Sequence, residues 1–132
     1  ASPDKSALAG VALALPALER AAKLQRRAAR TGFDWPDASG PRAKIDEELA
    51  ELEAETDHQR MLEEMGDLLF AVVNLARLSN VNPTLALQRA NQKFTRRFGR
   101  IEEMAMEAGL GMEEAGLEAL DQLWNAVKRE ER

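Results

Sequence analysis

The sequence contains no cysteine and only one histidine, His58. The chain can therefore form no disulfide and no thiolate metal site, and the usual zinc site of histidine and cysteine ligands is excluded. An excess of basic residues is also missing, because the net charge is −5, and this argues against a general nucleic-acid binder. No apolar run approaches the roughly 20 residues that a membrane span requires, so we expect no contact with a membrane.

Hydrophobic residues make up 45% and charged residues 31% of the 132 residues, which is typical of a folded globular protein. A chain of this length predicts one domain over residues 1–132. The apolar stretch 7–18 resembles the core of a signal peptide, but it has no strongly basic lead-in and runs into an amphipathic pattern. We therefore expect a cytoplasmic protein in which residues 1–13 form a poorly ordered lead-in.

Helix-favouring residues dominate and no segment alternates as a strand should. Apolar spacing predicts five helices, over about residues 15–29, 41–55, 59–78, 83–108 and 112–130. Pro41 and Pro83 suit first turns, while Gly32 and Gly109 suit helix ends. The stretch 68–76 is apolar on every side, which indicates a helix buried all round. The chain is therefore predicted to be all-α, an antiparallel helical bundle with short links.

Two pairs of carboxylates stand out on successive predicted helices. Glu48 and Glu51 lie three residues apart on one side of the second helix, a pattern that a solvated acidic face also explains. Glu64 and Asp67 lie three apart on the third helix, and the same stripe continues into its buried half. Carboxylates near a core need protonation, a cation or a metal.

If the second and third helices pack antiparallel, the two pairs face each other and present four carboxylates to one point. Such a site of hard oxygen ligands suits Mg²⁺, with Mn²⁺ as a substitute. The alternative is a set of salt bridges to lysines and arginines of neighbouring helices.

The fourth predicted helix carries a basic face. Lys93, Arg97 and Arg100 share one side of it, beside Phe94 and Phe98. The chain has no P-loop glycine pattern, so side chains of this kind and the metal would have to hold a phosphate chain. An ordinary solvated face that pairs with Glu102 and Glu103 is the alternative.

Aromatic and amide side chains are candidates for contacts with a nucleobase, because rings stack on bases and amides can read their edges. The candidates are Gln25, Trp35, Asn91 and Trp124, with Phe33 beside Trp35. Each of them also has an explanation in core packing.

From about Gly10 onward the sequence resembles the MazG family of all-α nucleoside triphosphate pyrophosphohydrolases. The blocks that carry the resemblance are Leu15-Pro16-Ala17-Leu18, Lys23-Leu24-Gln25-Arg26-Arg27-Ala28-Ala29, Gly32-Phe33-Asp34-Trp35, Glu47-Glu48-x-x-Glu51, Glu63-Glu64-Met65-Gly66-Asp67, Asn74-Leu75-Ala76-Arg77 and Ala90-Asn91-x-Lys93-Phe94-x-Arg96-Arg97-Phe98. The chain looks like the second, catalytic repeat of the two-repeat bacterial form.

The resemblance implies Mg²⁺-dependent hydrolysis of a nucleoside triphosphate to the monophosphate and pyrophosphate, on a four-helix core that is completed by dimerisation. It matches the four carboxylates to metal ligands, Lys93 and Arg97 to phosphate-binding positions, and Trp124 to an aromatic near the nucleotide. A homodimer or higher homo-oligomer with broad, house-cleaning specificity is expected. A deoxyuridine-specific or phosphoribosyl-ATP-specific relative would use the same metal chemistry.

Our mechanistic hypothesis is that a water attacks in line at a phosphorus of the α–β linkage. Glu47 is the candidate general base, because it adjoins Glu48 and can take a proton without binding the metal. Lys93 and Arg97 then stabilise the charge on the leaving oxygen. The alternative function is a non-catalytic, dimerising regulatory module whose acidic cluster is a salt-bridge network.

Overall fold

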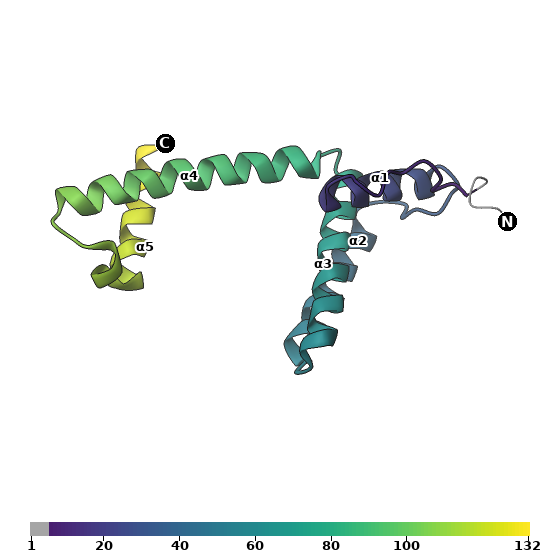
Figure 1. Ribbon diagram of the computed structural model, residues 1–132, viewed down its shortest axis with the longest axis horizontal. Coiled ribbons are helices and arrows are strands. Elements are labelled where there is room, and N and C mark those ends of the chain that lie inside the picture. Colours follow the sequence, from purple (N-terminus) through teal and green to yellow (C-terminus); the bar gives the residue numbers. More distant parts are fainter. Residues whose placement is uncertain (1–5) are drawn as a thin grey trace. The chain divides into compact units, whose positions relative to one another are not determined.

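The computed structural model describes residues 6–132, and every regular element among them is an α-helix (Figure 1). The helices are α1 (Ala17–Ala29), α2 (Ser39–Ala54), α3 (His58–Leu78), α4 (Pro83–Glu107) and α5 (Met112–Glu130). The prediction of an all-α chain is therefore confirmed. None of these helices in the described part is long and apolar enough to cross a membrane.

Polar caps set the helix starts. The Asp57 carboxylate accepts a hydrogen bond from the Gln59 backbone N–H, and the Asn82 amide oxygen accepts one from Leu85, so α3 and α4 begin near their predicted positions. Helix α2 begins two residues before the predicted Pro41. The N-cap residue, Ala38, has no side-chain cap, and the Asp37 carboxylate just before it accepts a 2.9 Å hydrogen bond from the Ser39 N–H.

The chain forms two compact units, one that ends at Ala86 and one over Leu87–Arg132. The single domain over residues 1–132 stays a prediction. In the first unit α2 and α3 form a helical hairpin, and α2 lies alongside α3 in Figure 1. Helix α1 packs on α3. Ala22 of α1 and Ala71 and Val73 of α3 are buried in this unit.

Residues 1–5 of the predicted lead-in lie outside the described residues. The residues that follow form turns, and the Arg27 guanidinium donates a 3.0 Å hydrogen bond to the Ala9 carbonyl.

The apolar middle of α3 differs from prediction. Ala71 and Val73 are buried, but Leu69 is 58% exposed, and Phe70 and Val72 are also exposed. The expected helix buried on every side is therefore wrong for this single chain. Helices α1 and α2 cover only part of its circumference, and an apolar face is left open.

The second unit contains most of α4 and the whole of α5. Ile101 and Ala105 of α4 and Val127 of α5 are buried in it. Phe94 stacks on Phe98 at 5.8 Å between ring centroids, although both rings remain exposed. Within α5, Gly116 takes a φ of +82°, which a glycine adopts without strain and which kinks the helix.

Candidate functional site

The first carboxylate of the predicted metal site, Glu48, is only 4% exposed. Its Oε1 lies 3.4 Å from the Lys44 ammonium, one helical turn earlier on α2. Its Oε2 is buried and has no hydrogen-bond partner among the described residues. A buried carboxylate oxygen without a partner is costly, so this position is suited to a further cation.

Glu51 and Glu64 lie within the electrostatic reach of Glu48. The charge of Glu48 is the main cause that raises the pKa of Glu51, and desolvation and Glu47 add to it. Desolvation is the main cause that raises the pKa of Glu64, and the negative charges of Glu55, Glu51 and Glu48 raise it further. Glu64 also has a buried Oε2 without a partner. These carboxylates repel one another, as ligands of one cation do before the cation binds.

Asp67 is exposed, but it lines a cavity of about 360 Å³ that it shares with Glu48 and Lys44. We expected Glu64 and Asp67 to enter the mouth of the core, and the Glu48 and Glu51 pair taken alone also allowed a solvated face. The expectation is wrong for Asp67, which is exposed, and the solvated alternative is wrong for Glu48, which is buried. Glu48 is buried where α2 packs against α3, whereas Asp67 is exposed in the wall of this cavity.

Within residues 6–132, no three acidic or histidine side chains stand close enough to hold a metal ion as they are arranged here. The metal site of Glu48, Glu51, Glu64 and Asp67 therefore stays a prediction. The residues fit a hard cation by their chemistry, since all are oxygen donors and two of their oxygens are buried without a partner.

Glu47, the candidate base, is exposed on α2. Its Oε1 lies 3.5 Å from the Lys44 ammonium, so the same lysine contacts Glu47 and Glu48. The carboxylate is accessible to a water, and its role stays a prediction.

The two predicted phosphate-binding arginines, Arg97 and Arg100, form ion pairs with Glu131 and Glu130. Arg97 donates to both carboxylate oxygens of Glu131, at 2.8 Å to Oε2 and 3.2 Å to Oε1, and its guanidinium lies 5.3 Å from the Trp124 ring centroid. Arg100 pairs with Glu130 at 3.1 Å, and it also contacts Glu103 and Glu107.

These pairs shift the titration of both partners. They raise the pKa of Arg97 and Arg100 and lower the pKa of Glu130 and Glu131. Sequence reasoning proposed Glu102 and Glu103 as partners and missed the terminal glutamates. The available signal was spacing, because Glu131 follows Trp124 by seven residues, and a helix that continues to its C-cap, Glu131, brings the two residues to one side.

The remaining basic and amide candidates of α4 are exposed. Lys93 makes no ion pair within 4 Å among the residues described, and its charge acts on Glu131 from a distance. The backbone carbonyl of Asn91 accepts a hydrogen bond from the Thr95 hydroxyl. Trp124 contacts Phe94 at 6.0 Å between centroids. Neither a phosphate-binding nor a nucleotide-binding role of these side chains is tested.

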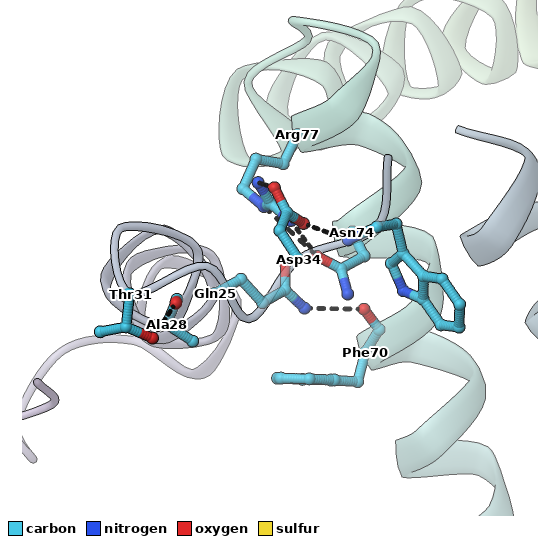
Figure 2. Close-up of polar contacts among 8 residues, drawn as sticks. Gln25, Ala28, Thr31, Asp34, Phe70, Asn74 and Arg77 are labelled. Carbon is cyan, nitrogen blue, oxygen red and sulfur yellow. Dashed lines mark hydrogen bonds and ion pairs between the residues drawn. The ribbon is translucent and has the colours of Figure 1, made fainter. Parts of the chain in front are cut away.

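Polar contacts join α1, the loop after it and α3 (Figure 2). The Gln25 amide nitrogen donates a 2.9 Å hydrogen bond to the Phe70 carbonyl. Arg77 donates to the Asp34 carboxylate at 3.1 Å and to the Asn74 amide oxygen at 2.9 Å. Asp34, Asn74 and Arg77 were not predicted as site residues, although all three stand in the sequence blocks that carry the family resemblance.

Comparison with known proteins gives a family match over residues 44–101, to the MazG nucleotide pyrophosphohydrolase domain. This segment contains all four predicted metal ligands. The "Nucleoside triphosphate pyrophosphohydrolase/pyrophosphatase MazG" of Thermotoga maritima is 46% identical over 114 residues, which are 86% of this chain and 45% of that protein.

Two further relatives cover nearly the whole chain. The "Nucleoside triphosphate pyrophosphohydrolase" of Escherichia coli K12 is 44% identical over 131 residues, 96% of this chain and 50% of that protein. "Uncharacterized protein YabN" of Bacillus subtilis is 46% identical over 133 residues, 98% of this chain and 27% of that protein. The chain thus spans half or less of the length of these relatives.

Proposed function

Since the chain belongs to the MazG nucleotide pyrophosphohydrolase family, we propose that it hydrolyses nucleoside triphosphates to nucleoside monophosphate and pyrophosphate. The observation that carries the proposal is the buried Glu48 carboxylate, which has one oxygen without a partner beside the mutually repelling Glu51 and Glu64. A structural salt bridge would satisfy such an oxygen, whereas a cation-binding site leaves it available.

The proposed cofactor is Mg²⁺, for which Mn²⁺ can substitute. Glu48 and Glu51 of α2 and Glu64 and Asp67 of α3 are its proposed ligands. The bound ion would neutralise the phosphate chain and lower the pKa of an attacking water. Side-chain rotations are needed to bring the four carboxylates together around a metal. In the present arrangement Glu48 forms an ion pair with Lys44, and no three carboxylates of the described residues are close enough to hold a metal ion.

Side chains of the chain carry out proton transfer and phosphate binding. Glu47 accepts the proton of the attacking water, and its exposed position beside Glu48 supports this role. Lys93, Arg97 and Arg100 contact the phosphates and stabilise the charge of the leaving pyrophosphate. The substrate must then compete with Glu131 for Arg97 and with Glu130 for Arg100.

Contacts with the nucleotide base are proposed for Gln25, Trp35, Asn91 and Trp124. A specificity that is broad across bases suits a house-cleaning enzyme, which is our proposal for this chain.

The open apolar face of α3 supports a dimer. Leu62, Met65, Leu69 and Val72 are exposed large hydrophobic residues on this one helix. We propose that a second copy of the chain covers them and completes a four-helix core. The dimer is then a homodimer built around two α2–α3 hairpins.

A dimerising module without activity is the second candidate, and the ion pairs of Arg97 and Arg100 favour it. Pyrophosphate release from a panel of ribo- and deoxyribonucleoside triphosphates, with Mg²⁺ and with chelator, separates the two. The enzyme releases pyrophosphate only with the metal. A module releases none from any triphosphate under either condition.

A further inference from the structure

Lys44 contacts two carboxylates of its own helix, α2. Its Nζ lies 3.4 Å from Oε1 of Glu48, one turn later, and 3.5 Å from Oε1 of Glu47. Glu48 is buried, whereas the side chain of Glu47 is 55% exposed and that of Lys44 is 45% exposed. The ammonium therefore reaches from the solvent to the buried carboxylate, which is the first of the proposed metal ligands.

The cavity of about 360 Å³ beside Glu48 has one basic side chain in its wall among the described residues, and this is Lys44. Glu48 and Asp67 contribute two carboxylates to the same wall. The other lining residues are uncharged, namely Trp35, Pro41, Phe70, Ala71 and Asn74. Charges interact more strongly beside such side chains than in bulk water. In the metal-free chain Lys44 is thus the cation of this cavity.

The two carboxylate oxygens of Glu48 differ in their surroundings. Oε1 lies against the Lys44 ammonium, whereas Oε2 is buried and has no hydrogen-bond partner among residues 6–132. A metal ion can reach Glu48 in two ways. It can bind Oε1 in place of the ammonium, or the carboxylate can turn and bring Oε2 out of the interior, which moves Oε1 away from Lys44. The ion pair breaks in both cases.

The ion pair joins Glu48 to a partner on its own helix, whereas Glu64 and Asp67 stand on α3. With the pair in place, no three carboxylates of the described part are close enough to hold a metal ion. A metal site that includes Glu48 therefore requires another position of this carboxylate. The contact that Glu48 loses in that movement is the one with Lys44.

We propose that Lys44 is a displaceable counter-cation, which neutralises Glu48 in the metal-free chain and leaves it when a divalent cation binds. The inference rests on the proposed function, because it needs the metal at Glu48, and it concerns the regulation of that site. Lysine and metal exclude each other at Glu48, so the ion pair lowers the affinity of the site for Mg²⁺. In return, the lysine lowers the cost of burying Glu48 without metal.

Two substitutions at position 44 test the competition. Lys44→Met keeps the unbranched stem and removes the charge, whereas Lys44→Arg keeps the charge and offers a guanidinium fork to the carboxylates. Calorimetric titration of the whole chain with Mg²⁺, without nucleotide, measures Kd. We expect Kd to fall about two- to fivefold in Lys44→Met, in line with the energy of a partly exposed ion pair. In Lys44→Arg the Kd should not fall.

Arg42→Met is the matched control, because Arg42 is an exposed residue of the same helix outside the wall of this cavity. It removes the same charge as Lys44→Met, and its Kd should stay as in the wild type.

Thermal denaturation without metal gives a second readout. Lys44→Met should melt below the wild type, since buried Glu48 loses its partner, and Mg²⁺ should raise its melting temperature by more than that of the wild type. A merely structural role of Lys44 would also lower the melting temperature without metal, but it would leave the Kd for Mg²⁺ unchanged or raise it.

The outcomes separate this inference from the proposed function. Unchanged or weaker Mg²⁺ binding by Lys44→Met, tighter binding by Lys44→Arg, or equal tightening by Arg42→Met would each overturn the displacement of Lys44. Pyrophosphate release by the wild type would then leave the function standing. Tighter binding by Lys44→Met alone, without pyrophosphate release from any triphosphate, would support the displacement and overturn the function. Absence of Mg²⁺ binding by the wild type would overturn the displacement, and the release assay would still decide the function.

Discussion

Lys44 and Glu48 form a 3.4 Å ion pair on one face of α2, and the lysine contacts only one oxygen of the buried carboxylate. The other oxygen has no partner among the described residues. The lysine thus compensates half of a carboxylate whose neighbours Glu51 and Glu64 are also acidic. In the proposed function, a bound divalent cation would supply the missing compensation.

Glu48→Gln should reduce Mg²⁺-dependent pyrophosphate release by about 100-fold or more, because the metal loses its buried ligand. Without metal the variant should be at least as stable as the wild type, since the repulsion on Glu51 is relieved. Steady-state kinetics and thermal denaturation without metal measure the two effects. Glu53→Gln, at an exposed position of the same helix, is the matched control and should leave both unchanged.

The stabilisation by Mg²⁺ should increase with pH. The pKa values of Glu51 and Glu64 are raised in the folded, metal-free chain, which therefore binds more protons than the unfolded chain above the ordinary value of 4.5. The contribution of these groups to metal-free stability is lost as pH rises through their raised pKa. Metal binding requires the carboxyl groups of Glu51 and Glu64 to be ionised, so the affinity for the metal increases over the same pH range.

Melting temperatures with and without Mg²⁺ test this effect, because their difference cancels the other titrating groups. The difference should widen from pH 4.5 towards neutrality, and a double Glu51→Gln, Glu64→Gln variant should show a small, flat difference. If the difference in melting temperature of the wild type stays constant from pH 4.5 to neutrality, Glu51 and Glu64 are not metal ligands.

Glu47→Gln separates proton transfer from metal binding. Turnover should fall by about 10²- to 10⁴-fold, because the water loses its general base. The Mg²⁺-induced rise in melting temperature should remain as in the wild type, since Glu47 is not a proposed ligand. Full activity would remove Glu47 from this role, and loss of the metal-induced stabilisation would assign it to the metal instead.

Glu131→Gln tests whether the ion pair with Arg97 competes with substrate. Without the glutamate charge, Arg97 is available to the phosphates, and KM should fall about two- to fivefold, in line with the small energy of an exposed ion pair. Glu118→Gln, elsewhere on α5, should not change KM. An increase in KM for Glu131→Gln would indicate that the pair positions Arg97 and does not compete with substrate.

Leu69→Arg places a charge on the open apolar face of α3. The proposed homodimer should dissociate, because an unpaired charge cannot be buried at low cost. Light scattering coupled to size exclusion reports the mass. Leu13→Arg, at an exposed position before α1, is the control that should keep the wild-type mass.

Most of the fold was predictable, because its helix ends depend on local chemistry. Pro83 and the Asn82 cap fix the start of α4, and Gly109 fixes its end, as the sequence indicates. The start of α2 was missed, because Ala38 at its N-cap carries no side-chain cap and the nearby hydrogen bond from Ser39 to Asp37 depends on the conformation of a loop. Burial was less predictable than helicity, since the pattern of α3 shows which residues are apolar but not which neighbours cover them.

The candidate site shows the same division. Spacing identified four carboxylates on two helices, but it predicted that Asp67 enters the core, whereas Asp67 is exposed. For Glu48 it also allowed a solvated position, whereas Glu48 is buried. Which carboxylate is covered depends on the packing of α2 on α3, which no single-helix pattern contains. Likewise Gln25 was recognisable as an amide candidate, but its free oxygen follows only from the position of the Phe70 carbonyl.

The proposed function is cleavage of the α–β linkage of nucleoside triphosphates with a divalent metal held by the carboxylates of α2 and α3. Chromatographic identification of the products from ATP, with Mg²⁺ and with chelator, for the wild type and Glu64→Gln, tests it most directly. We predict AMP and pyrophosphate in equal amounts, only with Mg²⁺ and only from the wild type. Formation of ADP and phosphate, or equal turnover by Glu64→Gln, would contradict the account.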